Sequence, residues 1–152
     1  MRKAPRERIL LASAFAGPPE EDGRALDELA ELVRSAGGDP AGRIAQRRRP
    51  GGGPHLFGQG KVAEIAAACA AAGAHAVVVR QSLSPGEMRR LEDALPCRVL
   101  DRTALILDVF AQRARSREGQ LQVELAQLLY RLPRLRGKGV ELSRLGGGIG
   151  TR

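Results

Sequence analysis

The chain has 152 residues, enough for one ordinary domain with an appendage or for two small units that share a core. Hydrophobic residues make up 43% of it but aromatic residues only 3%, so the core must consist of Leu, Val, Ile and Ala. We therefore do not expect stacking of aromatic side chains on bases to dominate any contact with nucleic acid.

The net charge of +8 is spread unevenly along the chain. Residues 1–100 carry 15 Lys and Arg against 12 Asp and Glu, whereas residues 101–152 carry 10 against 5. This asymmetry favours a polyanionic partner for the C-terminal part. The alternative is a basic protein without such a partner.

Cysteines and histidines are few. Cys69 and Cys97 are too far apart in the sequence for a zinc site, and His55 and His75 do not complete one. We interpret both cysteines as small buried hydrophobes. No apolar signal region and no run approaching the roughly 18 residues of a membrane span are present. We therefore expect a cytoplasmic protein in a reducing environment, with no metal site and no membrane span.

The first hundred residues alternate short β-like runs with helical ones, which predicts an α/β fold: a small, mainly parallel four-stranded sheet flanked by helices. Apolar runs predict strands at about residues 8–12, 42–47, 76–79 and 98–100. Helical spacing of apolar residues predicts helices at about residues 26–36 and 61–72. The basic and glycine-rich stretch 47–53 between them is expected to be a surface loop.

A third helix of this unit should begin after Ser84. The sequence Ser84-Pro85-Gly86-Glu87 has the Ser-x-x-Glu spacing of a capping box, with Pro at the first helical position. Met88, Leu91 and Leu95 would form the buried stripe of this helix.

From residue 101 onward the apolar period stays helical. Asp101 or Thr103 can cap a helix whose apolar positions are Leu105, Ile106, Val109 and Phe110. After a polar break at residues 115–119, leucines recur at spacings of four, three and four, as in a coiled-coil seam: Leu121, Leu125, Leu128 and Leu132. Pro133 ends this helix.

Two helices joined by a short turn predict an antiparallel two-helix hairpin over residues 101–133, about 20 Å long at about 1.5 Å per residue. Its turn would be the most exposed point. The remaining residues, 134–152, are rich in Gly and Arg and are interpreted as a linker to a further segment.

No motif for nucleotide hydrolysis is present. A P-loop needs G-x-x-x-x-G-K-[ST], and neither Gly60-Lys61 nor Gly137-Lys138 completes it. Gly58-Gln59-Gly60-Lys61 opens a predicted helix, where free N–H groups favour an anion or nucleotide. The interpretation that we favour is a structural turn with a solvated Lys61, because the acidic partner of a ribose is missing.

Arginines alternate across the predicted hairpin turn. Arg113, Arg115 and Arg117 are opposed only by Glu118, and guanidinium groups suit phosphates and can stack on bases. Taken alone, this run is equally typical of a solvated loop. Residues 47–49, three consecutive arginines, we interpret as a solvated loop with incidental affinity for polyanions.

Three stretches resemble a known family. DRTALILDVFAQRARSREGQLQVELAQLLYRLPRL, residues 101–135, resembles the segment that HflX-type GTPases carry before their G domain. LSRLGGGIGTR, residues 142–152, resembles the linker into that domain, and LFGQGKVAEI, residues 56–65, resembles the N-domain signature. The G domain itself is not in this sequence.

The resemblance implies an α/β N-terminal subdomain over residues 1–100, a helical-hairpin subdomain over 101–133 and a linker over 134–152 toward a G domain. It implies a monomer that binds the large ribosomal subunit and its rRNA. The intact GTP-bound protein would then split or rescue stalled ribosomes. The hairpin loop would reach toward the peptidyl-transferase centre, with the RNA-binding role falling on Arg113, Arg115, Ser116, Arg117 and Gly119.

Cofactors follow the same resemblance. GTP and magnesium belong to the G domain, so we expect no cofactor and no GTPase activity in this chain alone. Two alternatives stay open: an ATP-binding α/β domain with RNA-remodelling activity that uses Gly58, Gly60 and Lys61, and a structural domain that regulates the G domain. Calorimetry with ATP and GTP separates the first alternative from the others.

Overall fold

The computed structural model describes residues 5–48, 53 and 55–135. Its elements, in chain order, are β1 (Arg8–Phe15), α1 (Pro19–Ser35), β2 (Asp39–Arg47), α2 (Gln59–Ala72), β3 (Ala76–Val79), α3 (Pro85–Ala94), β4 (Arg98–Asp101), α4 (Arg102–Arg113), α5 (Arg117–Arg131) and a short 3₁₀ helix, η1 (Leu132–Arg134). The predicted linker from residue 136 onward lies outside the described residues.

The four strands form one sheet in the order β2-β1-β3-β4, and every neighbouring pair is parallel. The predicted α/β fold is therefore confirmed. β1 is longer than predicted, because it continues to Phe15 alongside the whole of β2. The chain reverses direction across the sheet between β1 and β3, so the carboxyl ends of these two strands form the switch point of the fold.

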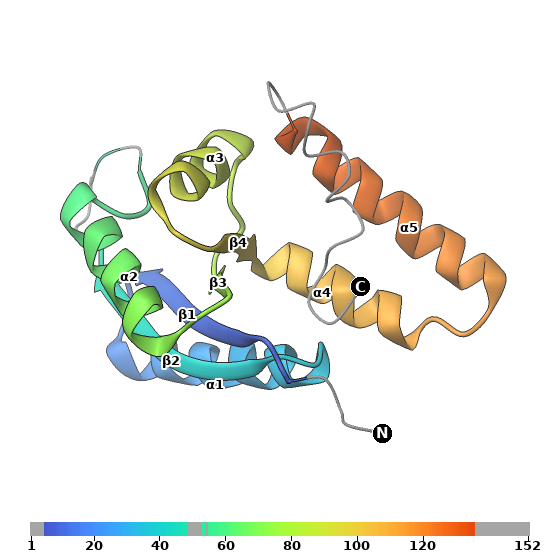
Figure 1. The fold of residues 1–152 in the computed structure, drawn as a ribbon, viewed down its shortest axis with the longest axis horizontal. Helices are drawn as coiled ribbons and strands as arrows, with labels where there is room; N and C mark the ends of the chain where they lie inside the picture. The colour runs from blue at the N-terminus through green and yellow to red at the C-terminus, as the bar shows by residue number, and fades with distance from the viewer. Residues whose placement is uncertain (1–4, 49–52, 54, 136–152) are drawn as a thin grey trace.

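Helices cover both faces of the sheet (Figure 1). Alternate residues of a strand point to opposite faces, so β1 contributes Ile9 and Leu11 to one core and Leu10, Ala12 and Ala14 to the other. Helices α1 and α4 pack on the first face, and α2 and α3 pack on the second. The continuous apolar run of β3 follows from this arrangement, because both faces of that strand are buried.

Two helix starts follow local chemistry. The Ser84 hydroxyl accepts a hydrogen bond from the backbone N–H of Glu87 at 3.2 Å, and Pro85 is the first residue of α3, as predicted. Of the two caps considered for α4, the structure selects Asp101, which accepts from the N–H of Ala104 at 2.9 Å. The Thr103 hydroxyl instead contacts that of Ser82 at 3.0 Å.

Helix α4 belongs to the core of the α/β unit as well as to the hairpin. Leu105 and Val109 are buried in the same cluster as Leu26, Leu29 and Val33 of α1. The predicted apolar stripe is only partly right: Ile106 is half-buried and Phe110 is exposed. The reason is geometric, since only one edge of the stripe meets α1 and the sheet.

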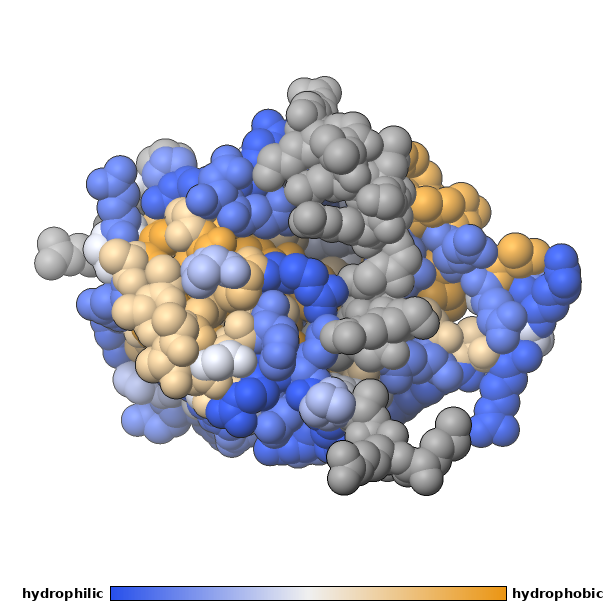
Figure 2. All heavy atoms as spheres, viewed as in Figure 1, coloured by the Kyte–Doolittle hydropathy of each residue, from blue (hydrophilic) through white to orange (hydrophobic). Residues whose placement is uncertain are grey.

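Helix α5 buries no residue. The four leucines of the predicted seam are 38 to 57% exposed, and Leu129 is 63% exposed. Figure 2 shows hydrophobic side chains over the part of the molecule where Figure 1 draws α5. The leucines have the spacing of a coiled-coil seam but are not buried in one, because α4 turns its apolar face to α1 and the sheet.

Polar contacts attach α5 to the rest of the molecule. The Gln127 side chain donates to the buried carboxylate of Asp108 at 3.3 Å. The Arg134 guanidinium donates to the Leu83 carbonyl at 2.7 Å and lies over the Tyr130 ring, 3.8 Å from its centroid. None of the helices in the described part of the chain is long and apolar enough to cross a membrane.

Candidate nucleic-acid interface

The turn between α4 and α5 is shorter than the sequence predicts. Only residues 114–116 lie between the helices, and Ala114 and Ser116 both have extended backbone. The predicted polar break at residues 115–119 therefore extends too far: Arg117 is the first residue of α5 and Gly119 lies in its first turn. A serine cap explains the early start, because the Ser116 hydroxyl accepts from the N–H of Gly119 at 3.0 Å.

This turn has a defined geometry. A Cβ at position 119 would lie 3.0 Å from the Ser116 hydroxyl oxygen, so glycine lets the cap close tightly. The Gln120 side chain donates to the Ala114 carbonyl at 3.3 Å, and the N–H of Ala114 bonds to the Phe110 carbonyl at 2.9 Å. In this structure Ser116 caps α5 and Gly119 leaves room for the cap. Both residues therefore shape the backbone that carries the neighbouring arginines.

Arg113, Arg115 and Arg117 are all exposed, and none of the ion pairs within the described ranges involves them. Glu118, in the first turn of α5, is the one acidic residue between Asp108 and Glu124. We call these three arginines the arginine tip. Most other arginines that could bind a phosphate are engaged; those paired with carboxylates are Arg8, Arg34, Arg43, Arg80, Arg90 and Arg98.

The arginine tip lies at the end of the hairpin, at the opposite end of the molecule from α2 (Figure 1). Its positive charge is therefore carried away from the carboxylates of the α/β unit. A partner with deep, negatively charged grooves would have room for the arginine tip while the α/β unit stays outside the groove. This arrangement suits a partner such as folded RNA, in which phosphates line clefts.

The turn that opens α2, for which anion binding was the alternative to a structural role, is an ordinary helix start. Gly58 caps α2 with extended backbone and no side-chain bond, and the Lys61 ammonium donates to the Glu64 carboxylate at 2.6 Å. A Cβ at either Gly58 or Gly60 would meet nothing within 4 Å. The geometry thus gives Lys61 a partner within its own helix, and nothing in the described part of the turn requires glycine.

The basic stretch before this turn folds back on the body where it is described. The Arg47 guanidinium donates to the Gly17 carbonyl at 3.3 Å and lies 4.9 Å from the centre of the Phe15 ring. Arg48 donates to the Gly53 carbonyl at 3.5 Å. Arg49 lies outside the described residues.

Glu87 has a role that the capping-box pattern did not reveal. Its carboxylate accepts from the backbone N–H of Leu56 at 3.3 Å, contacts His55 at 3.2 Å and pairs with Arg90 at 3.0 Å. Arg90 also donates to the Phe57 carbonyl at 2.9 Å. Glu87 and Arg90 of α3 thus hold the segment that leads into α2, although Glu87 and Leu56 are 31 residues apart in the sequence.

The switch point of the sheet is filled by a buried polar cluster. The Ser13 hydroxyl donates to the Asp22 carboxylate, and the Arg80 guanidinium contacts both, at 3.1 Å from the hydroxyl and 3.2 Å from the carboxylate. Parallel α/β sheets commonly bind ligands here, but these three groups satisfy one another. The cavity beside them is small, about 120 Å³. This cluster was not predicted from the sequence, because Ser13 lies just past the strand predicted at residues 8–12, whereas β1 continues to Phe15.

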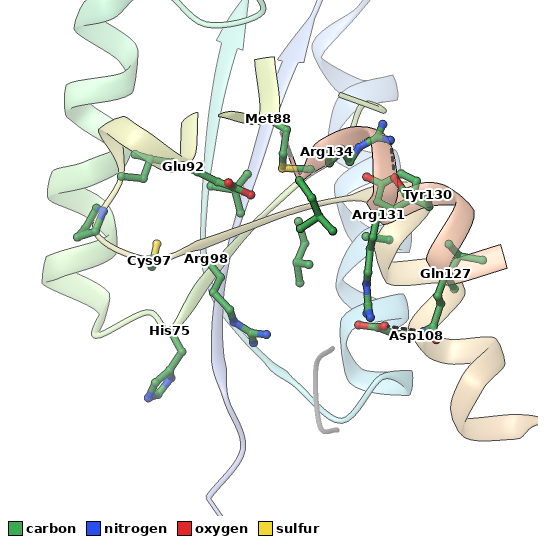
Figure 3. Close-up of a pocket in the computed structure, with 17 residues that line it drawn as sticks. His75, Met88, Glu92, Cys97, Arg98, Asp108, Gln127, Tyr130, Arg131 and Arg134 are labelled. Carbon is green, nitrogen blue, oxygen red and sulfur yellow. Dashed lines mark hydrogen bonds between the residues drawn. The ribbon is translucent and has the colours of Figure 1, made fainter. Parts of the chain in front are cut away.

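A larger groove of about 550 Å³ lies between β4 and α5. Figure 3 shows the residues that line it, with Cys97 and Arg98 on the side of the sheet and Gln127, Tyr130 and Arg134 on α5 and η1. Burial, reinforced by the neighbouring Asp101 carboxylate, raises the pKa of the Tyr130 hydroxyl. This groove separates α5 from β4, the edge strand of the sheet.

The expectation that both cysteines are buried is confirmed for Cys69 and wrong for Cys97. Cys69 is buried in α2, but Cys97 is half-buried in the turn before β4, and their sulfur atoms are 3.2 Å apart. Burial raises the pKa of both thiols, that of Cys69 to about 12. Among the described residues no group of His, Cys, Asp and Glu could hold a metal ion.

The family models assign this α/β unit and helical hairpin to the N-terminal and middle regions of a GTP-binding GTPase. The family model for the N-terminal region of GTP-binding GTPases matches residues 23–111, and the model for their middle region matches residues 113–152. A solved GTP-binding protein from Sulfolobus solfataricus, in complex with GDP, has the same fold over 90% of this chain, with a TM-score of 0.60 and 24% identity, and the match covers 40% of that protein.

The chain belongs to the HflX GTPase family. It is 48% identical over 147 residues to GTPase HflX of Caldanaerobacter subterraneus, a match that covers 97% of this chain and 34% of that protein. It is 47% identical over 133 residues to GTPase HflX of Escherichia coli, covering 88% of this chain and 31% of that protein. The chain thus spans about a third of the length of the curated relatives that it matches.

Proposed function

We propose that this chain is the ribosome-binding region of an HflX-type GTPase and that the arginine tip is its principal contact with the rRNA of the large ribosomal subunit. The observation that carries the proposal is a cluster of unpaired charge: three exposed arginines lie within five residues and have no carboxylate partner in the described structure, whereas six arginines of the α/β unit pair with carboxylates. Unpaired guanidinium groups are free to bind phosphates.

RNA binding and GTP hydrolysis belong to different parts of the intact protein in this proposal. With no P-loop in its 152 residues, the chain binds RNA but neither binds nor hydrolyses GTP. GTP and magnesium bind to the G domain in the two-thirds of the family's length that this chain does not span. GTP-dependent splitting or rescue of stalled ribosomes is then an activity of the whole cytoplasmic protein, in which this region supplies the attachment.

The test is co-sedimentation of the chain with purified large ribosomal subunits across a salt titration. In the tip variant, Arg113, Arg115 and Arg117 are replaced by Ala, which removes up to three phosphate contacts. The slope of log affinity against log salt should fall by up to about 2 to 3 units, and most binding should be lost. The fold should be unchanged, since exposed substitutions shift stability by no more than about 0.5 kcal/mol each.

A matched control removes the same charge from the body. Arg24, Arg34 and Arg43 are exposed on α1 and β2, and Arg34 and Arg43 form only surface pairs. Their triple Ala variant should keep near-parental binding and salt slope. If the tip variant co-sediments as well as the parent, or if the two triple variants lose binding equally, the tip is only a solvated loop and the proposal is wrong.

A further inference from the structure

Two thiols that are distant in the sequence meet between α2 and the turn that leads into β4. The Cys69 and Cys97 sulfur atoms lie 3.2 Å apart although 28 residues separate them. A disulfide requires a separation of about 2.05 Å, so the two atoms need to approach by only about 1 Å. The fold, and not the sequence spacing, creates this proximity.

The two cysteines differ in their access to solvent. Cys69 is 2% exposed and packs in the core cluster of α2, α3 and the sheet. Cys97 is half-buried and lines the groove between β4 and α5, where Figure 3 shows it on the stretch that leads into β4. A small reagent in the groove can therefore reach Cys97, whereas Cys69 is buried and is shielded from the reagent.

We propose that Cys69 and Cys97 are a redox pair that a low-molecular-weight disulfide, such as glutathione disulfide, converts into an intramolecular disulfide clamping α2 to the start of β4. The site is independent of the proposed RNA contact, because neither cysteine belongs to the hairpin. In a compartment that keeps thiols reduced, such a disulfide forms transiently and reports an oxidising shift.

The reaction proceeds in two exchange steps. First, the Cys97 thiolate attacks one sulfur of the small disulfide, whose S–S bond breaks, and a small thiolate leaves. Second, the Cys69 thiol loses its proton to solvent, attacks the Cys97 sulfur of the mixed disulfide and expels the second small thiolate. The two protein thiols lose two electrons and two protons, and the small disulfide is reduced to two thiols.

The clamp acts on the connection between α3 and β4. β4 begins at Arg98, directly after Cys97, and ends at Asp101, whose carboxylate caps α4. Cross-linking Cys97 to α2 thus fixes the start of the edge strand that leads into the hairpin. Closing a loop of 28 residues should raise the melting temperature of the oxidised chain by on the order of 10 °C over the reduced chain.

The experiment incubates the full 152-residue chain with defined ratios of reduced and oxidised glutathione, quenches with acid, and locates thiols and disulfides by mass spectrometry. The expected product is a monomer that has lost two hydrogen atoms and yields a Cys69–Cys97 cross-linked peptide. It should form at an oxidised-to-reduced ratio at least about tenfold lower in the native chain than in urea, because only the fold holds the thiols together.

Single variants test the order of events. Cys69→Ala should stop at the mixed disulfide on Cys97, and Cys97→Ala should remain unmodified while native, because Cys69 is shielded; circular dichroism confirms that each is folded. Two results would overturn the proposal: a native chain that keeps both thiols free or stops at a mixed disulfide, and a disulfide that forms no more readily in the native chain than in urea.

Discussion

The α/β unit and helix α5 contain the same kind of residue in opposite environments. Leu11, Leu91 and Leu105 are completely buried, whereas every leucine of the α5 seam is at least 38% exposed. Both regions have amphipathic periodicity, so periodicity alone does not separate them. The difference shows that the α/β unit is stabilised by packing of its apolar core, whereas hydrogen bonds attach α5 and the η1 turn that follows it to the rest of the molecule.

Charge follows the same division. Six arginines of the α/β unit pair with carboxylates, and one of them, Arg80, contacts the buried carboxylate of Asp22. The arginine tip makes no such pair in the part of the chain that is described, and its backbone is held by a serine cap and not by its charged groups. Removing charge should therefore affect folding in one region and binding in the other.

The largest expected effect on stability compares two leucines. Leu105→Ala removes a side chain that is 0% exposed, so it should lower the free energy of unfolding by about 2 to 5 kcal/mol. Leu125→Ala, at 57% exposed, should cost less than about 1 kcal/mol. Urea unfolding of both variants measures the difference. Equal losses would mean that α5 is packed in solution and that the comparison between the regions fails.

Asp101 joins the two regions and gives the next largest effect. Its buried carboxylate accepts from the N–H of Leu83 at 2.8 Å and from that of Ala104 at 2.9 Å. Asp101→Ala leaves a buried donor without a partner, which should cost about 1 to 3 kcal/mol. Thr103→Ala is the control and should cost no more than about 0.5 kcal/mol. Thermal melts of the pair decide which residue is the effective cap.

Stability should also depend on alkaline pH through the α/β core. Because burial raises the pKa of Cys69 from 9.0 to about 12, the unfolded chain releases this proton at lower pH than the native chain does. The free energy of unfolding should therefore fall as pH rises from about 9 to about 12. Cys69→Ala should flatten this dependence in reduced protein. Parallel curves for parent and variant would show that the thiol does not titrate differently on folding.

The smallest effect is expected at the turn before α2. Lys61→Ala breaks a surface pair with Glu64, so stability should change by less than about 0.5 kcal/mol. Binding of ATP, phosphate and RNA, measured by calorimetry, should match the parent. A clear loss of ATP binding would instead favour the nucleotide-binding interpretation, with Glu64→Ala as the control that removes the pair but keeps the ammonium group.

Local chemistry in the sequence predicted the kinds and the order of the elements and the Ser84 cap of α3, but it left Asp101 and Thr103 open for α4 and did not predict the Ser116 cap of α5. The buried run of β3, the start of α3 at Ser84 and the turn of the hairpin depend on hydrogen bonds and side-chain periods within a few residues. The parallel sheet follows from alternating strands and helices. The exposure of the three tip arginines also follows from sequence, because they lie in or directly beside the short turn between two helices.

Tertiary structure decided which residues meet across long separations. The sulfur contact of Cys69 with Cys97, the bond of Glu87 to the segment before α2 and the contact of Arg80 with Asp22 depend on the strand order β2-β1-β3-β4. The exposure of α5 is of the same kind. Helical spacing places its leucines on one face, but what covers a face is set by neighbouring elements, and α4 directs its apolar side chains to α1 and the sheet.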